Sequence, residues 1–286
     1  MKYSISVKQE VYKMKVDGLS YKEISFQTRI PYNTLTSWFR SKNLSQEQRS
    51  KLKHPGIKYS YNMKLFETPN ALTYYLLGVF YADGNVHQNL KTIILTSKDL
   101  DWLEAINKVV CPTSNIIFHP KNCSYSYLRI NNKIIVDWFV KSGCVPAKSL
   151  IVNYPTNMPA KYNSHFIRGV FDGDGCMAMS KPKKGTYVVN FKPTIVTASE
   201  KFFDILTKVL NANNIKVSYH KSKEKDHYST MYIIHMCGGA NAVRFCEFIY
   251  KDNNICLQRK YDKYQEYLNI RKEEILNIQK RRKSKS

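Results

Sequence analysis

Two ten-residue segments of the chain resemble each other, and both end in Asp-Gly. The first covers residues 75–84 and the second covers residues 166–175. Apolar residues at helical spacing predict that each segment is a helix, with Asp83 and Asp174 in the last turn. A carboxylate at the C-terminal end of a helix is disfavoured by the helix dipole, by a few tenths to about 1 kcal/mol. An unfavourable feature that occurs in both copies indicates that the two acids have a function.

Small residues four positions apart leave one face of each predicted helix without large side chains. They are Gly78 and Ala82 in the first copy, and Gly169 and Gly173 in the second. Two such helices can approach each other more closely than ordinary side chains permit. The final glycines, Gly84 and Gly175, are expected to end the helices in a left-handed conformation.

If the two helices pair with each other, Asp83 and Asp174 converge, and their mutual repulsion requires a cation. A small set of oxygen ligands suits Mg²⁺ (or Mn²⁺), because this ion keeps several waters and contacts phosphate groups. The pattern therefore predicts metal-assisted hydrolysis of phosphodiesters. The predicted metal site consists of the two acids and the glycines that follow them, Gly84 and Gly175.

The composition favours a polyanionic partner and excludes several classes of protein. The 286 residues include 45 Lys+Arg and 22 Asp+Glu, which gives a formal net charge of +23. A field of this size most often serves nucleic-acid binding. No run of about 18 apolar residues is present, so a membrane-spanning helix is excluded. Because the seven cysteines form no Cys-x-x-Cys pair, we expect reduced thiols and an intracellular protein, in the cytoplasm or nucleoid.

Each duplicated segment is followed by strand-like and helix-like stretches in the same order. After the first segment we predict strands at 92–97, 116–119 and 125–131, and helices at 100–110 and 134–142. After the second we predict strands near 187–197, 215–220 and 231–236, and helices near 200–211 and 240–251. The pattern indicates an α+β chain of two pseudo-symmetric αββαββα halves, at 69–160 and 161–268.

The two segments resemble the LAGLIDADG motif of homing endonucleases, in the single-chain form that carries two copies. Residues 143–149 and 154–155 resemble the family's sequence between its motifs, and residues 257–261 resemble its ending. The likeness extends over about residues 70–268. It implies that the motif helices form the interface of the two halves and that the sheets form a saddle-shaped surface over double-stranded DNA. It also implies that the last acid of each motif binds a divalent metal and directs water at the scissile phosphates.

The resemblance further implies a basic residue near the second hairpin that stabilises the charged phosphorane. Lys133 is the counterpart in the first half, and a solvated turn lysine is the alternative interpretation. The second half has Gly238 and Gly239 in the corresponding region and no lysine. The family motif has a second acidic residue, two positions before the last one. The first copy has Tyr81 at this position, and the second copy has Asp172. Neither residue is expected at the metal.

Residues 1–45 are expected to form a separate DNA-binding unit. Three short helices are predicted, with Gly18 ending the first, Ser20 capping the second and Pro31 separating the second from the third. The last two have the arrangement of a helix-turn-helix, and an ordinary three-helix bundle is the alternative. The third helix would offer polar side chains to a major groove, namely Asn33, Thr34, Thr36, Ser37 and Arg40. Residues 46–68 are predicted to be a basic linker.

Strands that alternate apolar and polar residues are expected to present one polar face to DNA. This face includes Arg129 in the first half, and Lys216 and His220 in the second. Basic residues in loops and near the end of each half are predicted to bind DNA: Lys148, Lys181, Lys183, Lys184, Lys221, Lys223, Arg259 and Lys260. The tail at 269–286 is expected to be a flexible basic arm.

The leading hypothesis is a monomeric, site-specific endonuclease that uses Mg²⁺ to cut both strands of a long duplex site. The N-terminal unit would add a second contact region and increase affinity through linked binding. A catalytically silent DNA-binding regulator on the same scaffold is one alternative, although two mutually repelling acids argue against a relic. An RNA-splicing maturase is the other, although a helix-turn-helix suits duplex DNA better than A-form RNA, whose major groove is closed to side chains.

Overall fold

A computed structural model describes most of the chain as two compact units, Met1–Tyr59 and Ser60–Ser286. The described residues are 3–40, 44–45, 48, 59–114, 116–118, 125–155, 157–180, 189–223 and 230–283. Lys181, Lys183 and Lys184, which are predicted to bind DNA, lie outside these residues. No described helix has the length and apolar character needed to cross a membrane. The six described cysteines are all free thiols.

The first unit contains the three predicted helices, α1 (Ile5–Val16), α2 (Tyr21–Thr28) and α3 (Tyr32–Trp38). Ser20 caps α2 as predicted, because its hydroxyl accepts the Glu23 N–H while the Glu23 carboxylate accepts the Ser20 N–H. Gly18 follows α1 with a positive φ of 102°. A small core of Val11, Ile24, Ile30 and Leu35 holds the helices together.

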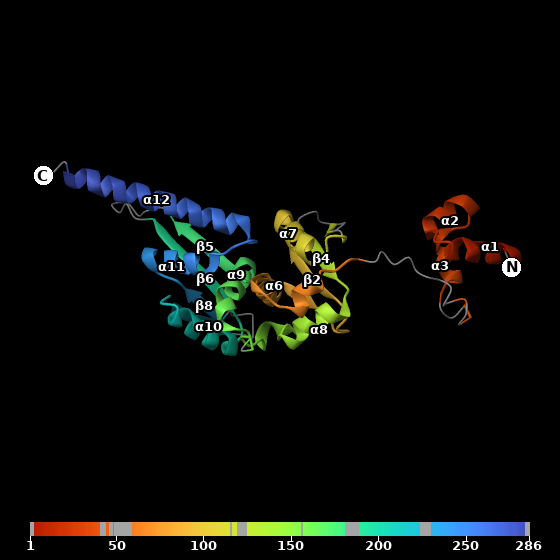
Figure 1. The fold of residues 1–286 in the computed structure, drawn as a ribbon, viewed down its shortest axis with the longest axis horizontal. Coiled ribbons are helices and arrows are strands. Elements are labelled where there is room, and N and C mark those ends of the chain that lie inside the picture. Colours follow the sequence, from red (N-terminus) through yellow and green to blue (C-terminus); the bar gives the residue numbers. More distant parts are fainter. Residues whose placement is uncertain are drawn as a thin grey trace. The chain divides into compact units, whose positions relative to one another are not determined.

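The second unit consists of two halves with the same order of elements (Figure 1). The first half contains α5 (Lys64–Glu67), α6 (Ala71–Ala82), β1 (Gly84–Val86), β2 (Ile93–Ser97), α7 (Leu100–Val110), β3 (Ile117–Phe118), β4 (Ser126–Ile130) and α8 (Lys133–Lys141). The short 3₁₀ helices η2 (Lys148–Leu150) and η3 (Ala160–Tyr162) connect the halves. The second half contains α9 (Asn163–Asp174), β5 (Gly175–Ser180), β6 (Asn190–Thr197), α10 (Glu200–Ala212), β7 (Ser218–Lys223), β8 (Thr230–His235), α11 (Gly239–Tyr250) and α12 (Gln258–Lys283).

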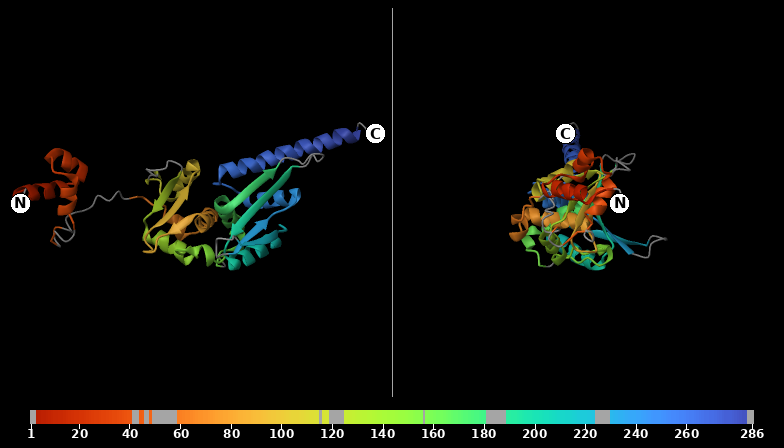
Figure 2. Two further views of the ribbon diagram at one scale, coloured as in Figure 1. Left: turned by 180° about the vertical axis from the view of Figure 1, so that it is seen from behind. Right: turned by 90° about the vertical axis from the view of Figure 1, so that its right-hand side faces the viewer.

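The two sheets have equivalent topologies, which confirms the predicted duplication. Each has four strands joined by antiparallel pairs, in the order β1-β2-β4-β3 in the first half and β5-β6-β8-β7 in the second. The paired helices α6 and α9 lie between the two sheets, as the views in Figures 1 and 2 show. The side chains of α6 are apolar around almost its whole circumference, which is the pattern of a helix enclosed by protein.

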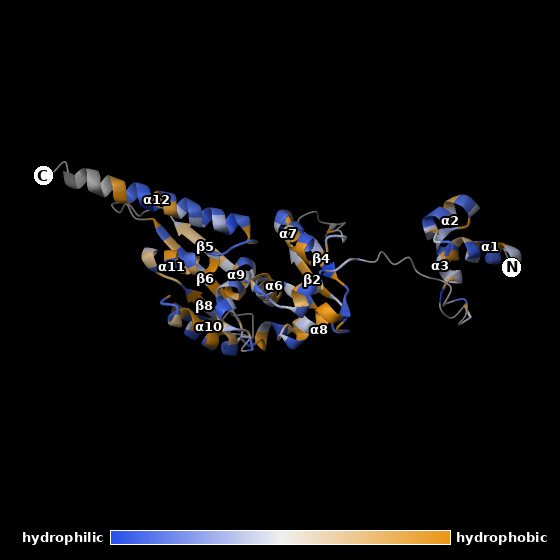
Figure 3. Cartoon of the chain, in the orientation of Figure 1, coloured by the Kyte–Doolittle hydropathy of each residue, from blue (hydrophilic) through white to orange (hydrophobic). Residues whose placement is uncertain are grey.

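Three features of the fold differ from the sequence-based expectations. Strands β1 and β5 begin directly at the final glycine of each motif and were not predicted. Leu65 and Phe66 on α5 are buried in the core of the second unit, so the segment expected to be a linker becomes part of the fold before residue 68. The tail expected to be an irregular arm is helical, because α12 continues to Lys283, and the part of α12 that is coloured in Figure 3 is mainly hydrophilic.

Candidate active site

The helices α6 and α9 are in backbone contact where their small residues face each other. A Cβ atom added to Gly78 would lie against the carbonyl oxygen of Phe166 and 2.8 Å from the Val170 nitrogen. A Cβ atom added to Gly169 would lie against the Tyr75 carbonyl oxygen and 2.6 Å from the Val79 nitrogen, both on α6. The predicted close approach of the two motif helices is therefore confirmed.

This contact brings Asp83 and Asp174 together at the C-terminal ends of the two helices. Asp83 is the C-terminal cap of α6, and Asp174 is the last residue of α9. A Cβ atom added to Gly173, which precedes Asp174, would lie 3.1 Å from Oδ2 of Asp83. Both aspartates are exposed to solvent. No hydrogen bond to either carboxylate group is found within the described part of the chain.

The protein around the two acids withdraws water from their carboxylates. Burial raises the pKa of Asp174 to about 6, and the neighbouring Asp83 carboxylate adds to this increase. Burial also raises the pKa of Asp83 above its ordinary value. Two cations oppose these shifts at both sites, Lys148 and Lys260. The structure therefore holds two carboxylates in an electrostatically unfavourable arrangement that a cation would relieve.

The lysines near the acids are buried beneath the site. Lys148 lies on η2 with 8% of its surface exposed, and its Nζ donates to the Gly84 carbonyl oxygen. Lys260 lies in the first turn of α12 with 3% exposed, and its Nζ donates to the carbonyl oxygens of Phe171 at 2.5 Å and Asp172 at 2.8 Å. Burial lowers the pKa of Lys260 to about 8. Both lysines were predicted to bind DNA at the surface, and this prediction is wrong because their ammonium groups bond to the motif backbone.

The donor set fits a hard divalent cation. Two carboxylates from different helices converge, and no cluster of three or more His, Cys, Asp or Glu side chains is present in the described ranges. Mg²⁺ is typically held by one or two carboxylates while waters and substrate phosphates complete its coordination. Asp83 and Asp174 would therefore hold the ion, and a bound ion would supply charge stabilisation at a phosphate and an activated water.

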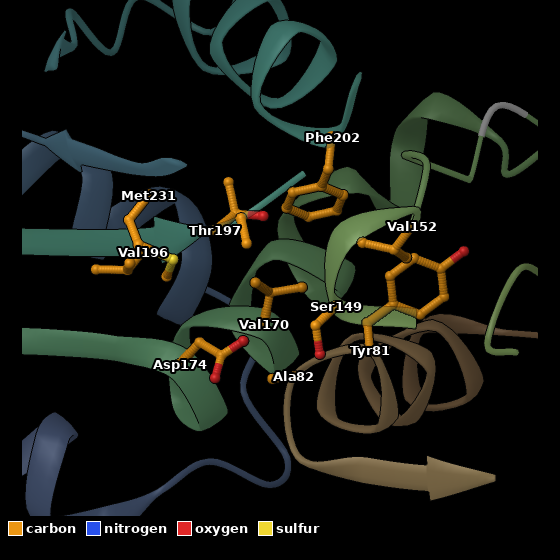
Figure 4. A pocket seen from close by; sticks show the side chains of 11 residues that line it. Tyr81, Ala82, Ser149, Val152, Val170, Asp174, Val196, Thr197, Phe202 and Met231 are labelled. Atoms are coloured by element: carbon orange, nitrogen blue, oxygen red, sulfur yellow. The ribbon is translucent and has the colours of Figure 1, made fainter. Parts of the chain in front are cut away.

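A pocket of about 240 Å³ opens beside Asp174 at the interface of the two halves. Its walls come from α6, η2, α9, β6, α10 and β8, and Figure 4 shows Ala82, Asp174 and Ser149 lining it. The wall contributed by Tyr81, Val152 and Phe202 is largely apolar. The surface beside Asp174 is therefore concave and is formed jointly by both halves.

The second half of the chain matches a known family. Residues 161–250, which contain α9 and the strands and helices that follow it as far as α11, match the family model described as LAGLIDADG-like domain. This region is therefore similar to a LAGLIDADG-like domain. The first half lies outside the matched residues and repeats the element order of the LAGLIDADG-like domain.

Solved structures of low sequence identity have a related arrangement of elements. A mesophilic variant of the homing endonuclease I-DmoI is 14% identical with a TM-score of 0.44, over 64% of this chain and 97% of that one. A double mutant of I-SmaMI is 14% identical with a TM-score of 0.47, over 70% of this chain and 90% of that one. Full-length WhiA from Thermatoga maritima is 16% identical with a TM-score of 0.44, over 73% of this chain and 64% of that one. No curated protein sequence matches the chain. These identities and TM-scores are too low to support a conclusion about activity.

The LAGLIDADG-like domain has one sheet face that is free of helices. Strand register places Lys192, Thr194, His220 and His235 on this face, opposite to the buried Ile234. His235 was not predicted, yet its Nε2 lies 3.2 Å from Nδ1 of His220, and its Nδ1 lies 3.0 Å from the Thr194 hydroxyl. The strand alternation located His220, but His235 could be identified only once the pairing of β7 with β8 was known.

Of the predicted DNA-binding cations of the second half, Lys221 and Arg259 have acidic partners and do not lie free on that face. Lys221 lies on the opposite side of β7, where its Nζ is 3.5 Å from the Glu200 carboxylate and 4.9 Å from the centre of the Tyr232 ring. The Arg259 guanidinium donates from Nε to the Asp99 carboxylate at 2.9 Å. Lys216 precedes β7 and is exposed. Lys223 ends β7 opposite Thr230.

In the first half, Arg129 lies on the exposed face of β4, where its guanidinium is 5.7 Å from the centre of the Tyr127 ring. Lys133 begins α8 and forms an exposed ion pair with Asp137, at 2.7 Å. Lys133 is not among the basic groups that lower the pKa of Asp83 or Asp174, whereas Lys148 and Lys260 lower the pKa of both.

The glycines that follow the two acids have a different role from the one expected. Gly175 has φ −78° and ψ 152°, which is extended backbone, and Gly84 is also outside the positive-φ region. A Cβ atom at Gly175 would collide with the ring and carbonyl oxygen of Phe171, and one at Gly84 would collide with Phe80. The glycines therefore allow the strand to turn back tightly over the end of the helix.

The predicted recognition surface of the first unit lies on α3. Asn33 and Arg40 are exposed, whereas Thr34, Thr36 and Ser37 are half-buried. The Thr36 hydroxyl donates to the Asn33 carbonyl oxygen at 3.1 Å, which leaves its oxygen available as an acceptor. The face of α3 is thus polar, with donors and acceptors of the kind that contact base edges.

Proposed function

We propose that the protein is a site-specific DNA endonuclease that hydrolyses a phosphodiester in each strand of a long duplex site with Mg²⁺ or Mn²⁺. The observation that carries this proposal is the pair of carboxylates, Asp83 and Asp174, at one end of the seam between α6 and α9. Each acid comes from a different half, so the site is suited to a substrate with two equivalent strands. The LAGLIDADG-like match on residues 161–250 and the net charge of +23 support the same function.

In this proposal the protein groups position and stabilise charge. Asp83 and Asp174 hold the divalent ion, with the backbone at Gly84 and Gly175 shaping the site around it. Lys148 and Lys260 offset the negative charge of the two acids from below and stabilise the charge that develops on the phosphate. The sheet faces that carry Arg129 and His220, together with the exposed Lys216 before β7, contact the duplex on either side of the cleaved bonds.

Selection from a randomised duplex pool tests the proposed function. The purified protein is incubated with the pool in excess Mg²⁺, and molecules with two cut strands are recovered and sequenced. We expect a single enriched recognition sequence and cleavage at fixed positions in both strands. Chelation with EDTA should stop cleavage while binding to the selected duplex persists. Enrichment by binding with no cut products in Mg²⁺ or Mn²⁺ would instead favour the silent regulator.

The N-terminal unit is expected to add phosphate contacts to those of the second unit. Deletion of residues 1–59 should weaken binding to the selected duplex and reduce the slope of log K against log salt, because each lost phosphate contact removes about 0.9 from that slope. Fluorescence anisotropy over a range of KCl concentrations measures both quantities. The second unit has its own core, so it provides a folded comparison. An unchanged slope would contradict a DNA-binding role for this unit.

A further inference from the structure

Tyr81 in the first motif and Asp172 in the second occupy equivalent positions, two residues before the acids proposed to bind metal. Both side chains are buried, with 7% of Tyr81 and 1% of Asp172 exposed. Tyr81 makes a hydrogen bond to the backbone of the segment that follows α8, and Asp172 makes one to the backbone of the segment between α11 and α12. These are the segments that deliver Lys148 and Lys260 to the site.

In the second half, Asp172 fastens the chain just before α12. Its Oδ2 accepts the backbone N–H of Leu257 at 3.0 Å and the hydroxyl of Tyr75 at 2.9 Å, and its Oδ1 accepts the hydroxyl of Tyr250 at 3.3 Å. Leu257 is followed within one turn by Lys260. The Nζ of Lys260 then reaches back to the carbonyl oxygens of Phe171, Asp172 and Gly173. The segment is therefore attached to α9 at both ends.

In the first half, Tyr81 binds the chain just after α8. Tyr81 is the donor of its hydrogen bond, whereas Asp172 is an acceptor. The Tyr81 hydroxyl donates to the carbonyl oxygen of Ser142, and a Cβ atom on the next residue, Gly143, would collide with that hydroxyl. The Cys144 thiol donates to the Phe80 carbonyl oxygen at 3.2 Å. The same segment ends in Lys148, whose Nζ donates to the Gly84 carbonyl oxygen.

We propose that Tyr81 and Asp172 are paired positioning residues, each of which holds the lysine-bearing segment of its half against the motif helix. The proposal rests on the proposed nuclease function and identifies what keeps its two cations in place. The same motif position performs one task with different chemistry, because a phenol donates to a carbonyl oxygen and a carboxylate accepts from an N–H. The substitution of an acid by Tyr81 is on this account a change of anchor and not a loss of a ligand.

Each lysine bonds to the backbone of the motif in its own half. The Nζ of Lys148 donates to the carbonyl oxygen of Gly84, directly after Asp83, and the Nζ of Lys260 donates to the carbonyl oxygens of Asp172 and Gly173, directly before Asp174. Because the two lysines lie beside different acids, loss of the Asp172 anchor and loss of the Tyr81 anchor should change the ratio of the two strand-nicking rates in opposite directions.

The test compares Asp172→Asn and Tyr81→Phe in the full chain, with Tyr154→Phe as a matched control. Tyr154 is a tyrosine of similar burial, 5% exposed, whose hydroxyl bonds to the Asn163 side chain and to neither lysine-bearing segment. Nicking of each strand is measured on the duplex selected from the randomised pool, and its Kd by anisotropy. Two further measurements need no DNA: amide hydrogen exchange of residues 142–149 and 256–261, and acetylation of Lys148 and Lys260 followed by mass spectrometry.

For Asp172→Asn we expect nicking to fall about 10- to 100-fold with little change in Kd, as is usual when a supporting contact behind a functional group is removed. Exchange should increase in 256–261, and Lys260 should become acetylated while Lys148 stays protected. Tyr81→Phe should give the converse result, in 142–149 and at Lys148. Tyr154→Phe should change neither the exchange of the two segments nor the acetylation of the two lysines.

The proposal is overturned if both lysines remain as protected from acetylation in Asp172→Asn and Tyr81→Phe as they are in the wild type. It is also overturned if nicking is lost while amide hydrogen exchange of the anchored segment is unchanged. If Asp172→Asn unfolds, exchange rises throughout the chain, and Tyr81→Phe then decides alone. If the wild-type protein cuts no duplex, the proposed nuclease function fails. The exchange and acetylation results still show in that case whether the two anchors hold the lysines.

Discussion

Replacement of Asp174 by asparagine is expected to lower cleavage of the selected duplex by about 10³-fold or more while Kd for that duplex changes little, because the carboxylate acts on the reacting phosphate and makes few ground-state contacts. Asp83→Asn should have an equally large effect, since the two acids converge on one point from α6 and α9. Single-turnover cleavage and anisotropy on the same DNA measure the two quantities. Asp204→Asn, an exposed aspartate of α10, is the matched control for the change in charge.

The same variants should be more stable than the wild type at alkaline pH when no metal is present. Asp174 has a pKa raised from the ordinary 3.8 to about 6, so the folded state binds more protons than the unfolded state between these values. This contribution to stability is fully present below pH 3.8 and is lost as pH rises through about 6. In EDTA at pH 8 we therefore expect Asp174→Asn to raise the Tm by about 2 °C, and the difference from wild type to vanish near pH 4. Cleavage that survives in both Asp83→Asn and Asp174→Asn would refute the assignment of the site.

The parts of the fold that were predicted depend on local patterns. Helix periodicity and the spacing of Gly78, Ala82, Gly169 and Gly173 were enough to place two closely packed helices, because backbone approach depends directly on side-chain size. The repeat then required equivalent sheets in the two halves. The predicted convergence of Asp83 and Asp174 depended in addition on the two helices pairing with each other, which the family resemblance implied. By contrast, β1 is only three residues long, so its pattern gave no signal distinct from the end of the preceding helix.

The parts that were not predicted depend on contacts between distant segments. Nothing in the sequence around Lys148 and Lys260 distinguishes them from surface lysines. Only the tertiary fold shows that their ammonium groups bond to carbonyl oxygens of the motifs. Lys221 was assigned to the DNA-binding surface by its charge, yet the register of β7 with β8 places it beside Glu200. A sequence reveals charge and periodicity, whereas the partner of a buried cation depends on which segments the fold brings together.

Replacement of Gly169 by alanine is expected to cause a large loss of stability. The new Cβ atom would lie 2.6 Å from the Val79 nitrogen and against the Tyr75 carbonyl oxygen, which are both backbone atoms and cannot rotate away. Helices α6 and α9 would have to separate, at a cost of about 3 kcal/mol or more. Urea unfolding followed by circular dichroism measures this change. Gly239→Ala is the control, because its Cβ atom would meet only the ends of the Tyr267 and Arg271 side chains.

Gly173→Ala separates the structural role of the seam from its role in aligning the acids. The added Cβ atom would meet the Ala82 methyl group and lie 3.1 Å from Oδ2 of Asp83. The Ala82 Cβ atom is fixed to its backbone and cannot rotate away, so the helix ends must separate slightly, whereas the Asp83 carboxylate can rotate. We expect a loss of stability of about 1–3 kcal/mol. Cleavage should nevertheless fall strongly, because the displaced group is the Asp83 carboxylate itself and misplacement by about 1 Å can cost 10²-fold in rate. If cleavage by this variant fell only in proportion to its stability, the close approach of the helices would serve folding alone, and the alignment of the two carboxylates would have to come from elsewhere in the halves.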